Sequence, residues 1–136
     1  MQTRTPDAYA IQFAARHDVA GFLKKELEQR LAPSYPPNSA LANILVTGED
    51  DDETSSTAAK TAEWAEQLIA KRGLSLVVLG PARAALARIK ERWRWHLVVR
   101  GSQEEVGRFV RYAAQRLAKG SRDVRVAVDR DPVSLL

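Results

Sequence analysis

The sequence has no cysteine in its 136 residues and only two histidines, His17 and His96. The absence of cysteine excludes disulfides, thiolate-bound zinc, iron–sulfur clusters and a cysteine nucleophile. Neither histidine stands at the spacing of a metal site or a catalytic triad. The seven glycines form no Walker or dinucleotide-binding loop, and the acidic run 49–53 lacks the spaced ligands of a calcium loop. We therefore predict no catalytic residue, no metal site and no cofactor in this chain.

Long apolar runs are also missing. No stretch approaches the length of a membrane span, and the first residues contain no signal-peptide core. We expect a cytoplasmic protein without a membrane partner. The apolar residues, 45% of the chain against 28% charged, are enough to build a core, and the length suits one domain.

The charges are unevenly divided along the chain. Residues 1–60 hold six Lys/Arg and nine Asp/Glu, whereas residues 61–136 hold fifteen and eight, for a net charge of +4. Twelve of the basic residues lie between Arg83 and Arg125, with four acidic residues among them. A basic second half favours a polyanionic partner such as nucleic acid; a solvated arginine-rich surface is the alternative.

Residues 1–37 are predicted to form two helices and a proline-rich linker. Residues 5–16 begin with a threonine cap, a proline and an aspartate, which favour a helix start. Asp18 is predicted to cap a second helix, whose apolar residues recur at helical spacing until Pro33 ends it. The prolines of the segment 32–39 make a stiff linker, so we place a domain boundary after residue 37.

From residue 38 onward the pattern changes to short strands alternating with helices. Strands are predicted at 40–47, 74–79, 93–100 and 124–129, and helices at 55–72 and 102–120. Residues 82–91 are predicted to add a short helix around Leu86 and Ile89. The order βαββαβ folds most simply as a four-stranded antiparallel sheet with both helices on one face. The expected class is thus α+β with a ferredoxin-like arrangement, whose other sheet face is open to a partner.

The segment 88–100 is the clearest candidate for a binding surface. Side chains alternate along a strand, so its tryptophans are predicted on the core side, and Arg92, Arg94 and His96 on the open face. Guanidinium groups bind phosphate through paired, charge-assisted hydrogen bonds, and a free tryptophan can stack on unpaired bases. The alternatives are tryptophans that only fill the core and arginines that only face solvent.

The predicted DNA-binding residues are Arg88, Lys90, Arg92, Trp93, Arg94, His96 and Arg125. Arg83, Arg108 and Arg111 are candidates for an extension of this basic surface.

Several short stretches occur together in a distinctive order: Tyr35-Pro36-Pro37, Val78-Leu79-Gly80-Pro81, Arg92-Trp93-Arg94-Trp95 and Asp129-Arg130-Asp131-Pro132-Val133. Their order resembles the C-terminus of the PriA family, the primosomal replication-restart helicases of bacteria. Residues 2–11 resemble the exit of the second motor lobe in that family, and residues 17–28 resemble the helical connector that follows it. The resemblance covers essentially the whole chain.

This resemblance implies a connector in residues 1–37 and a DNA-binding domain in residues 38–136, with a fold like that of the small ribosomal protein S10. It implies binding to forked and single-stranded DNA, at the nucleoid. The implied protein partners are the upstream helicase lobes, single-stranded-DNA-binding protein and other primosome proteins. The family's sites for ATP, magnesium and zinc would lie upstream of this region. Residues 103–107 depart from enterobacterial members, because Glu104 and Glu105 stand where those have basic and amide residues.

We expect the chain to hold the DNA backbone without reading sequence, and to lose affinity as salt rises. One alternative is a protein-interaction module, in which the arginines meet acidic protein surfaces and DNA affinity is small. Another is an RNA-binding domain of ribosomal type.

Overall fold

The computed structural model describes residues 4–29, 36, 39–117 and 123–132. The chain divides into two compact units, Met1–Asn38 and Ser39–Leu136. Within the described ranges, no helix is both long enough and apolar enough to cross a membrane.

The first unit contains two helices, α1 (Tyr9–Ala15) and α2 (Val19–Gln29). The predicted start of α1 is wrong, because its N-cap is Ala8, which makes no side-chain cap bond. Residues 5–8 form a turn instead, in which the Ala8 N–H donates to the Thr5 carbonyl over 3.1 Å. The predicted cap of α2 is confirmed: the Asp18 carboxylate accepts the Gly21 N–H over 2.8 Å. The predicted end of α2, at Pro33, lies outside the described residues.

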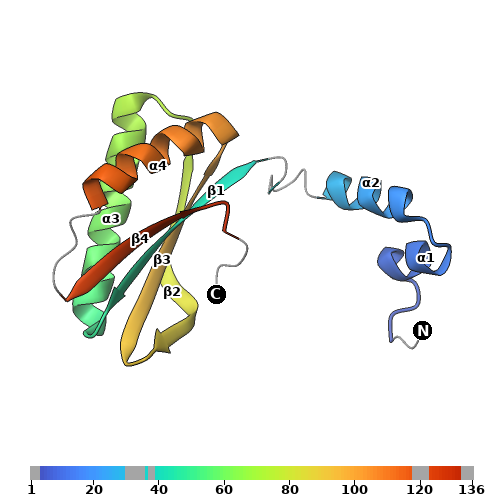
Figure 1. The fold of residues 1–136 in the computed structure, drawn as a ribbon, viewed down its shortest axis with the longest axis horizontal. Helices are drawn as coiled ribbons and strands as arrows, with labels where there is room; N and C mark the ends of the chain where they lie inside the picture. Colours follow the sequence, from blue (N-terminus) through green and yellow to red (C-terminus); the bar gives the residue numbers. More distant parts are fainter. Residues whose placement is uncertain (1–3, 30–35, 37–38, 118–122, 133–136) are drawn as a thin grey trace. The chain divides into compact units, whose positions relative to one another are not determined.

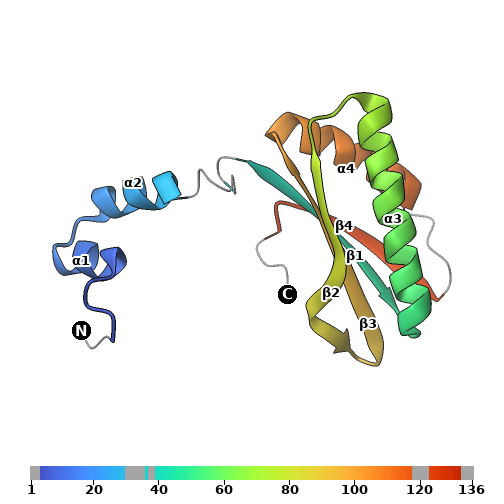
Figure 2. The ribbon, with the colours of Figure 1, turned by 180° about the vertical axis from the view of Figure 1, so that it is seen from behind.

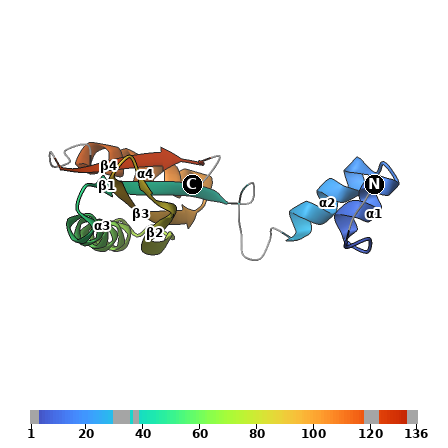
Figure 3. The same cartoon turned by 90° about the horizontal axis from the view of Figure 1, so that it is seen from below.

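The second unit is a four-stranded sheet with two helices. Its elements are β1 (Ala40–Gly48), α3 (Asp51–Arg72), β2 (Val77–Ile89), β3 (Arg92–Gly101), α4 (Gln103–Leu117) and β4 (Val124–Arg130). The strands lie in the order β2-β3-β1-β4, and every neighbouring pair is antiparallel (Figures 1 and 2). Seen from below, β1 and β4 run side by side (Figure 3). The predicted α+β class with a ferredoxin-like arrangement is confirmed.

Both helices pack on the same face of the sheet. The buried core joins alternate residues of β1 and β3 to one stripe of each helix: Ala40, Ala42, Ile44, Leu97, Val99, Ala62, Ala65, Val106, Phe109 and Ala113. Alanine predominates in the stripe of α3, and Trp64 beside it rests against Phe109 with ring centroids 6.0 Å apart. Since strand side chains alternate, the remaining residues of β1 and β3 face away from the helices.

Strand β2 differs from the prediction in its second half. The predicted short helix at 82–91 is wrong, because β2 continues through Gly80 and Pro81 to Ile89. Pairing with β3 supplies hydrogen-bond partners for the backbone, and this tertiary pairing outweighs the helix propensity of an alanine-rich segment. The pairing is irregular: residues 84–87 of β2 lie opposite the single residue Arg94 of β3, so β2 bulges there.

A two-residue turn closes the β2–β3 hairpin. Lys90 and Glu91 occupy it with φ of 50° and 60°. Asparagine and glycine are favoured at such positions, because left-handed backbone costs other residues roughly 1 kcal/mol each. The pairing of the two strands therefore holds this hairpin, and the turn itself carries two charged side chains.

The acidic run after β1 forms the start of α3, four residues earlier than predicted. Asp50 is the N-cap, and its carboxylate accepts the Glu53 N–H over 2.8 Å. Three further acidic residues occupy the first turn, where they stabilise the positive end of the helix dipole. At the other end, Gly73 is the C-cap, in left-handed conformation with φ of 60°. The acidic run therefore caps α3 and stabilises its first turn.

We expect Asp50→Ala to lower the free energy of unfolding by about 1 kcal/mol, because the Glu53 N–H loses its acceptor. Asp50→Ser is the matched control, since a serine oxygen can cap the same N–H group. Urea denaturation of both variants measures the difference. Equal destabilisation by alanine and serine would show that only the charge of Asp50 matters.

Candidate nucleic-acid interface

Three strands bring two of the predicted cations into one row on the face of the sheet that the helices leave uncovered. Thr47 of β1 is the register partner of Arg94 on β3 and of Arg125 on β4. Paired residues of an antiparallel sheet point to the same face, so all three side chains lie on the open face. The two arginine Cα atoms are separated by two strand spacings, about 10 Å.

A shallow hollow of about 290 Å³ forms around this row. Its lining consists of four cations and two uncharged residues: Lys90, Arg92, Arg94, Arg125, Thr47 and Ile89. We call these six residues the basic hollow. Four of the seven predicted DNA-binding residues thus meet in one place, although they come from β3, β4 and the hairpin turn. The geometry suits an anion with several oxygens, such as a phosphodiester.

Arg92 is half-buried and connects three parts of the sheet. Its guanidinium donates to the Glu49 carboxylate over 3.0 Å, to the Thr47 carbonyl over 3.3 Å and to the Asp123 carbonyl over 2.6 Å. Only 23% of its side chain is exposed. Arg92 therefore ties the end of β1 and the start of β4 to β3, and contributes less free charge than its neighbours.

Arg94 and Arg125 differ in how firmly they are held. Arg94 donates to the Leu86 carbonyl over 3.3 Å, which joins it to the bulge of β2. Arg125 is exposed and has no ion pair within the parts of the chain that the structure describes. Lys90, at the tip of the hairpin, is likewise exposed. Lys90 and Arg125 are thus the cations of the basic hollow that are most open to a ligand.

His96 lies on the same face of β3, two residues after Arg94. Its register partners are Leu45 of β1 and Ala82 of β2. Burial lowers its pKa below the ordinary value of 6.5, and the nearby Arg94 charge lowers the pKa further. Its Nδ1 is buried and has no hydrogen-bond partner among the described residues. The imidazole is consequently neutral at pH 7, so it adds no positive charge to the open face.

The remaining hairpin candidates lie on the opposite face, with the helices. Arg88 is the register partner of Trp93, and the guanidinium carbons of Arg83 and Arg88 lie 5.3 and 5.2 Å from the Trp93 ring centroid. Arg83 pairs with Asp51 and Arg88 with Glu91, so acidic neighbours neutralise both cations. The guanidinium groups of Arg83 and Arg88 thus lie over the Trp93 ring, which the sequence predicted to stack on bases.

Trp95 completes this arrangement from the core side. Its indole Nε1 donates to the Asp51 carboxylate over 2.8 Å, and its ring packs beside Val46 and Ala58. The predicted division of β3 into a core row and an open-face row is confirmed by this placement and by the burial of Leu97 and Val99.

The two candidates on α4 are separate from the basic hollow. Arg108 and Arg111 are exposed on a helix that covers the other face of the sheet, and Arg108 pairs with Glu104. They form no continuous surface with Arg94 and Arg125. The structure instead adds Thr47 and Ile89, which the sequence reasoning missed. Thr47 could have been found from the alternation of β1, in which Ala42, Ile44 and Val46 are core residues.

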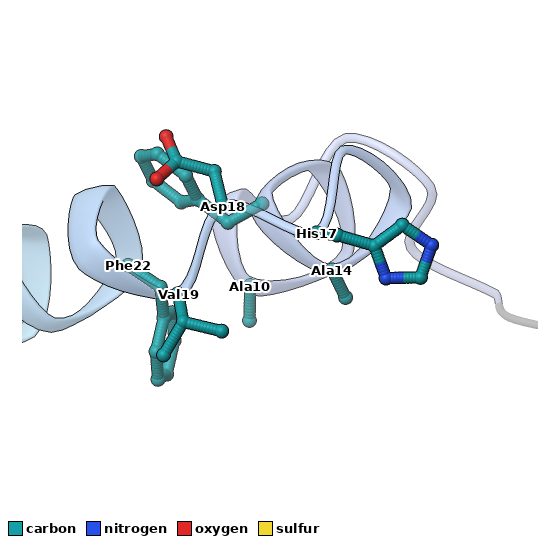
Figure 4. Close-up of a pocket in the computed structure, with 7 residues that line it drawn as sticks. Ala10, Ala14, His17, Asp18, Val19 and Phe22 are labelled. Atoms are coloured by element: carbon teal, nitrogen blue, oxygen red, sulfur yellow. The ribbon is translucent and has the colours of Figure 1, made fainter.

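A second hollow, of about 370 Å³, belongs to the helical unit and contains no predicted site residue. Figure 4 shows the side chains of Ala10, Ala14, Val19 and Phe22 on one side, with the Asp18 carboxylate turned away from them. Phe22 also stacks on Tyr9, with ring centroids 6.1 Å apart. This hollow is apolar and offers no cation to a phosphate.

The sheet, its two helices and the cations on its bare face together define a ferredoxin-like α+β domain with a basic open face. A sequence model of the family described as "Primosomal protein N C-terminal domain" matches residues 31–133. The chain belongs to this family, the PriA replication restart proteins.

Individual relatives agree with this assignment. The chain is 38% identical over 104 residues to the replication restart protein PriA of Bacillus subtilis, and 37% identical over 100 residues to that of Synechocystis. These matches cover 76% and 74% of the chain but only 12% of each relative. The PriA of Borreliella burgdorferi is 21% identical over all 136 residues, which make up 20% of that protein.

We expect Arg92→Ala to destabilise the domain by about 1–3 kcal/mol, because it removes three hydrogen bonds that join the end of β1 and the start of β4 to β3. Arg125→Ala removes the same charge from an exposed site and should stay within about 0.5 kcal/mol of the parent chain. Urea denaturation of both variants tests this. The structural role of Arg92 is refuted if the two variants are equally stable.

The His96 side chain should make the domain sensitive to acid. Because its pKa is lowered by folding, the unfolded chain binds the proton first as the pH falls below about 6.5. The stability present above that pH is then lost progressively, until the folded imidazole is also protonated. Between pH 7 and pH 5 the parent chain should lose more stability than His96→Gln. Parallel pH profiles of the two proteins would contradict the lowered pKa.

Proposed function

We propose that this PriA C-terminal domain binds forked and single-stranded DNA by holding backbone phosphates in the basic hollow. The observation that carries the proposal is the meeting of Lys90, Arg92, Arg94 and Arg125 on the helix-free face of the sheet. Among the residues that the structure describes, Glu49 is the acidic partner on this face, and it pairs with Arg92. Lys90 and Arg125 are exposed, so their positive charge is available to an anion.

The arrangement favours contact with the backbone of DNA over reading of its bases. Arg94 and Arg125 stand on either side of Thr47, so the two guanidinium groups could hold neighbouring phosphates, with a hydroxyl between them. Lys90 extends the positive surface toward the hairpin tip. Phosphate contacts position a protein on DNA and carry no sequence information. Binding should accordingly be general for sequence and sensitive to salt.

The proposal assigns no reaction to this chain. ATP-driven unwinding, and the magnesium and zinc sites implied by the resemblance, would belong to other parts of a PriA protein. Binding to chromosomal DNA would bring the domain to the nucleoid.

A second candidate function is docking of protein, and it rests on a different part of the open face. Val77 and Leu79 of β2 are 48% and 42% exposed, although phosphate binding does not require apolar side chains. An edge strand with such residues can receive the upstream helicase lobes, single-stranded-DNA-binding protein or another primosome protein. If docking is the only function, the isolated chain will have little affinity for DNA.

Fluorescence anisotropy with labelled forked, single-stranded and duplex DNA across a salt series tests the proposal. With about three phosphates neutralised, the logarithm of the association constant should fall with log salt at a slope of about −2 to −3. Lys90→Gln with Arg125→Gln should weaken binding to every sequence and reduce the slope by about two.

The double variant Arg108→Gln with Arg111→Gln is the matched control. It removes the same charge from α4, on the other face, and should leave binding to DNA nearly unchanged. Equal loss in both double variants would mean that net charge alone attracts DNA. Absence of binding to any DNA at low salt would refute the proposed function and leave protein docking.

A further inference from the structure

Two large apolar side chains are exposed beside the basic hollow. Ile89 lines the hollow next to Lys90 and is 41% exposed. Leu86 is 52% exposed and sits on the bulge of β2, where its carbonyl accepts the hydrogen bond from Arg94. These are the two residues around which the sequence predicted a short helix. In the structure they are strand residues, and the described part of the chain leaves both side chains exposed.

The bulge accounts for the position of Leu86. Residues 84–87 oppose only Arg94, so they leave the regular ladder while Ala84 stays buried and anchors the loop. Arg94 then fixes the backbone of the bulge against the rim of the basic hollow. An apolar group is thus held close to a phosphate-binding surface by a cation that belongs to that surface.

Apolar side chains next to phosphate-binding cations suit one feature of nucleic acid in particular. Leucine and isoleucine are among the residues that proteins insert between base steps, where they contact the faces of unstacked bases. In an unbroken duplex those faces are covered by neighbouring base pairs. At a branch point or in a single strand they are accessible at little unstacking cost.

We propose that Leu86 and Ile89 form an apolar contact for unstacked bases, and so give the domain its preference for branched and single-stranded DNA over duplex. This inference rests on the proposed function, because the cations of the basic hollow must first hold the adjacent phosphates. The cations supply affinity that every DNA shares. The two apolar side chains account for the difference in affinity between branched or single-stranded DNA and duplex DNA.

The test compares Leu86→Ser with Ile89→Ser, made together, against Val77→Ser with Leu79→Ser. The control pair removes similar apolar surface from the same strand, at the end of β2 away from the basic hollow. All four side chains are exposed, so both double variants should fold, which thermal unfolding checks. Binding is measured on a fork and on a duplex of the same length. A second readout is the emission of 2-aminopurine placed at the first unpaired base of the fork.

The expected result is a fall of about fivefold or more in the ratio of fork to duplex affinity for the Leu86/Ile89 variant, because affinity for the fork falls more than affinity for the duplex. Its complex should also lose the change in 2-aminopurine emission that the parent chain produces. The Val77/Leu79 variant should keep both. The inference is overturned if the Leu86/Ile89 variant keeps the parent ratio, or loses fork and duplex affinity equally. A parent chain that binds no DNA refutes the proposed function itself.

Discussion

The register of β1 between β3 and β4 is the constraint on which the other features depend. Because β1 is paired on both edges, each of its residues has a fixed partner on either side, and Thr47 lies between Arg94 and Arg125. The same register puts Ile44 beneath both helices, in the centre of the core. Core packing thus determines which cations meet on the far face, although no core residue contacts a ligand.

Most of the fold was predictable, because its signals are local. Short apolar runs indicated β1 and β3, and Asp18 indicated the start of α2, whereas the predicted cap of α1 was wrong. The second half of β2 was not predictable: alanines with Leu86 and Ile89 at helical spacing describe a helix equally well, and only pairing with β3 decides the outcome. The proposed site likewise has one part that local sequence patterns predict and one part that only the folded structure reveals. Alternation predicted that Arg92 and Arg94 share a face, but the three internal acceptors of Arg92 depend on loop positions that no local pattern contains.

The two faces of the β2–β3 hairpin have similar numbers of cations and different electrostatics. On the helix side, Asp51 and Glu91 neutralise Arg83 and Arg88, and Trp93 spreads beneath both guanidinium groups. On the open side, Glu49 is committed to Arg92. A count of charges along the sequence cannot separate these surroundings, because the acidic partners come from α3 and from the turn.

On strand β3, residues that face the helices alternate with residues of the open face, among them Arg92 and Arg94, so the spacing of the chain links the two rows. Loss or gain of one residue between Trp93 and Val99 would exchange the faces, burying guanidinium groups and exposing indoles. Loss or gain of two residues would leave each side chain of β3 on its face of the sheet, but would change its register partners on β1 and β2. A single inserted residue would therefore have to be accommodated by a bulge, as in β2, for both rows of β3 to keep their faces.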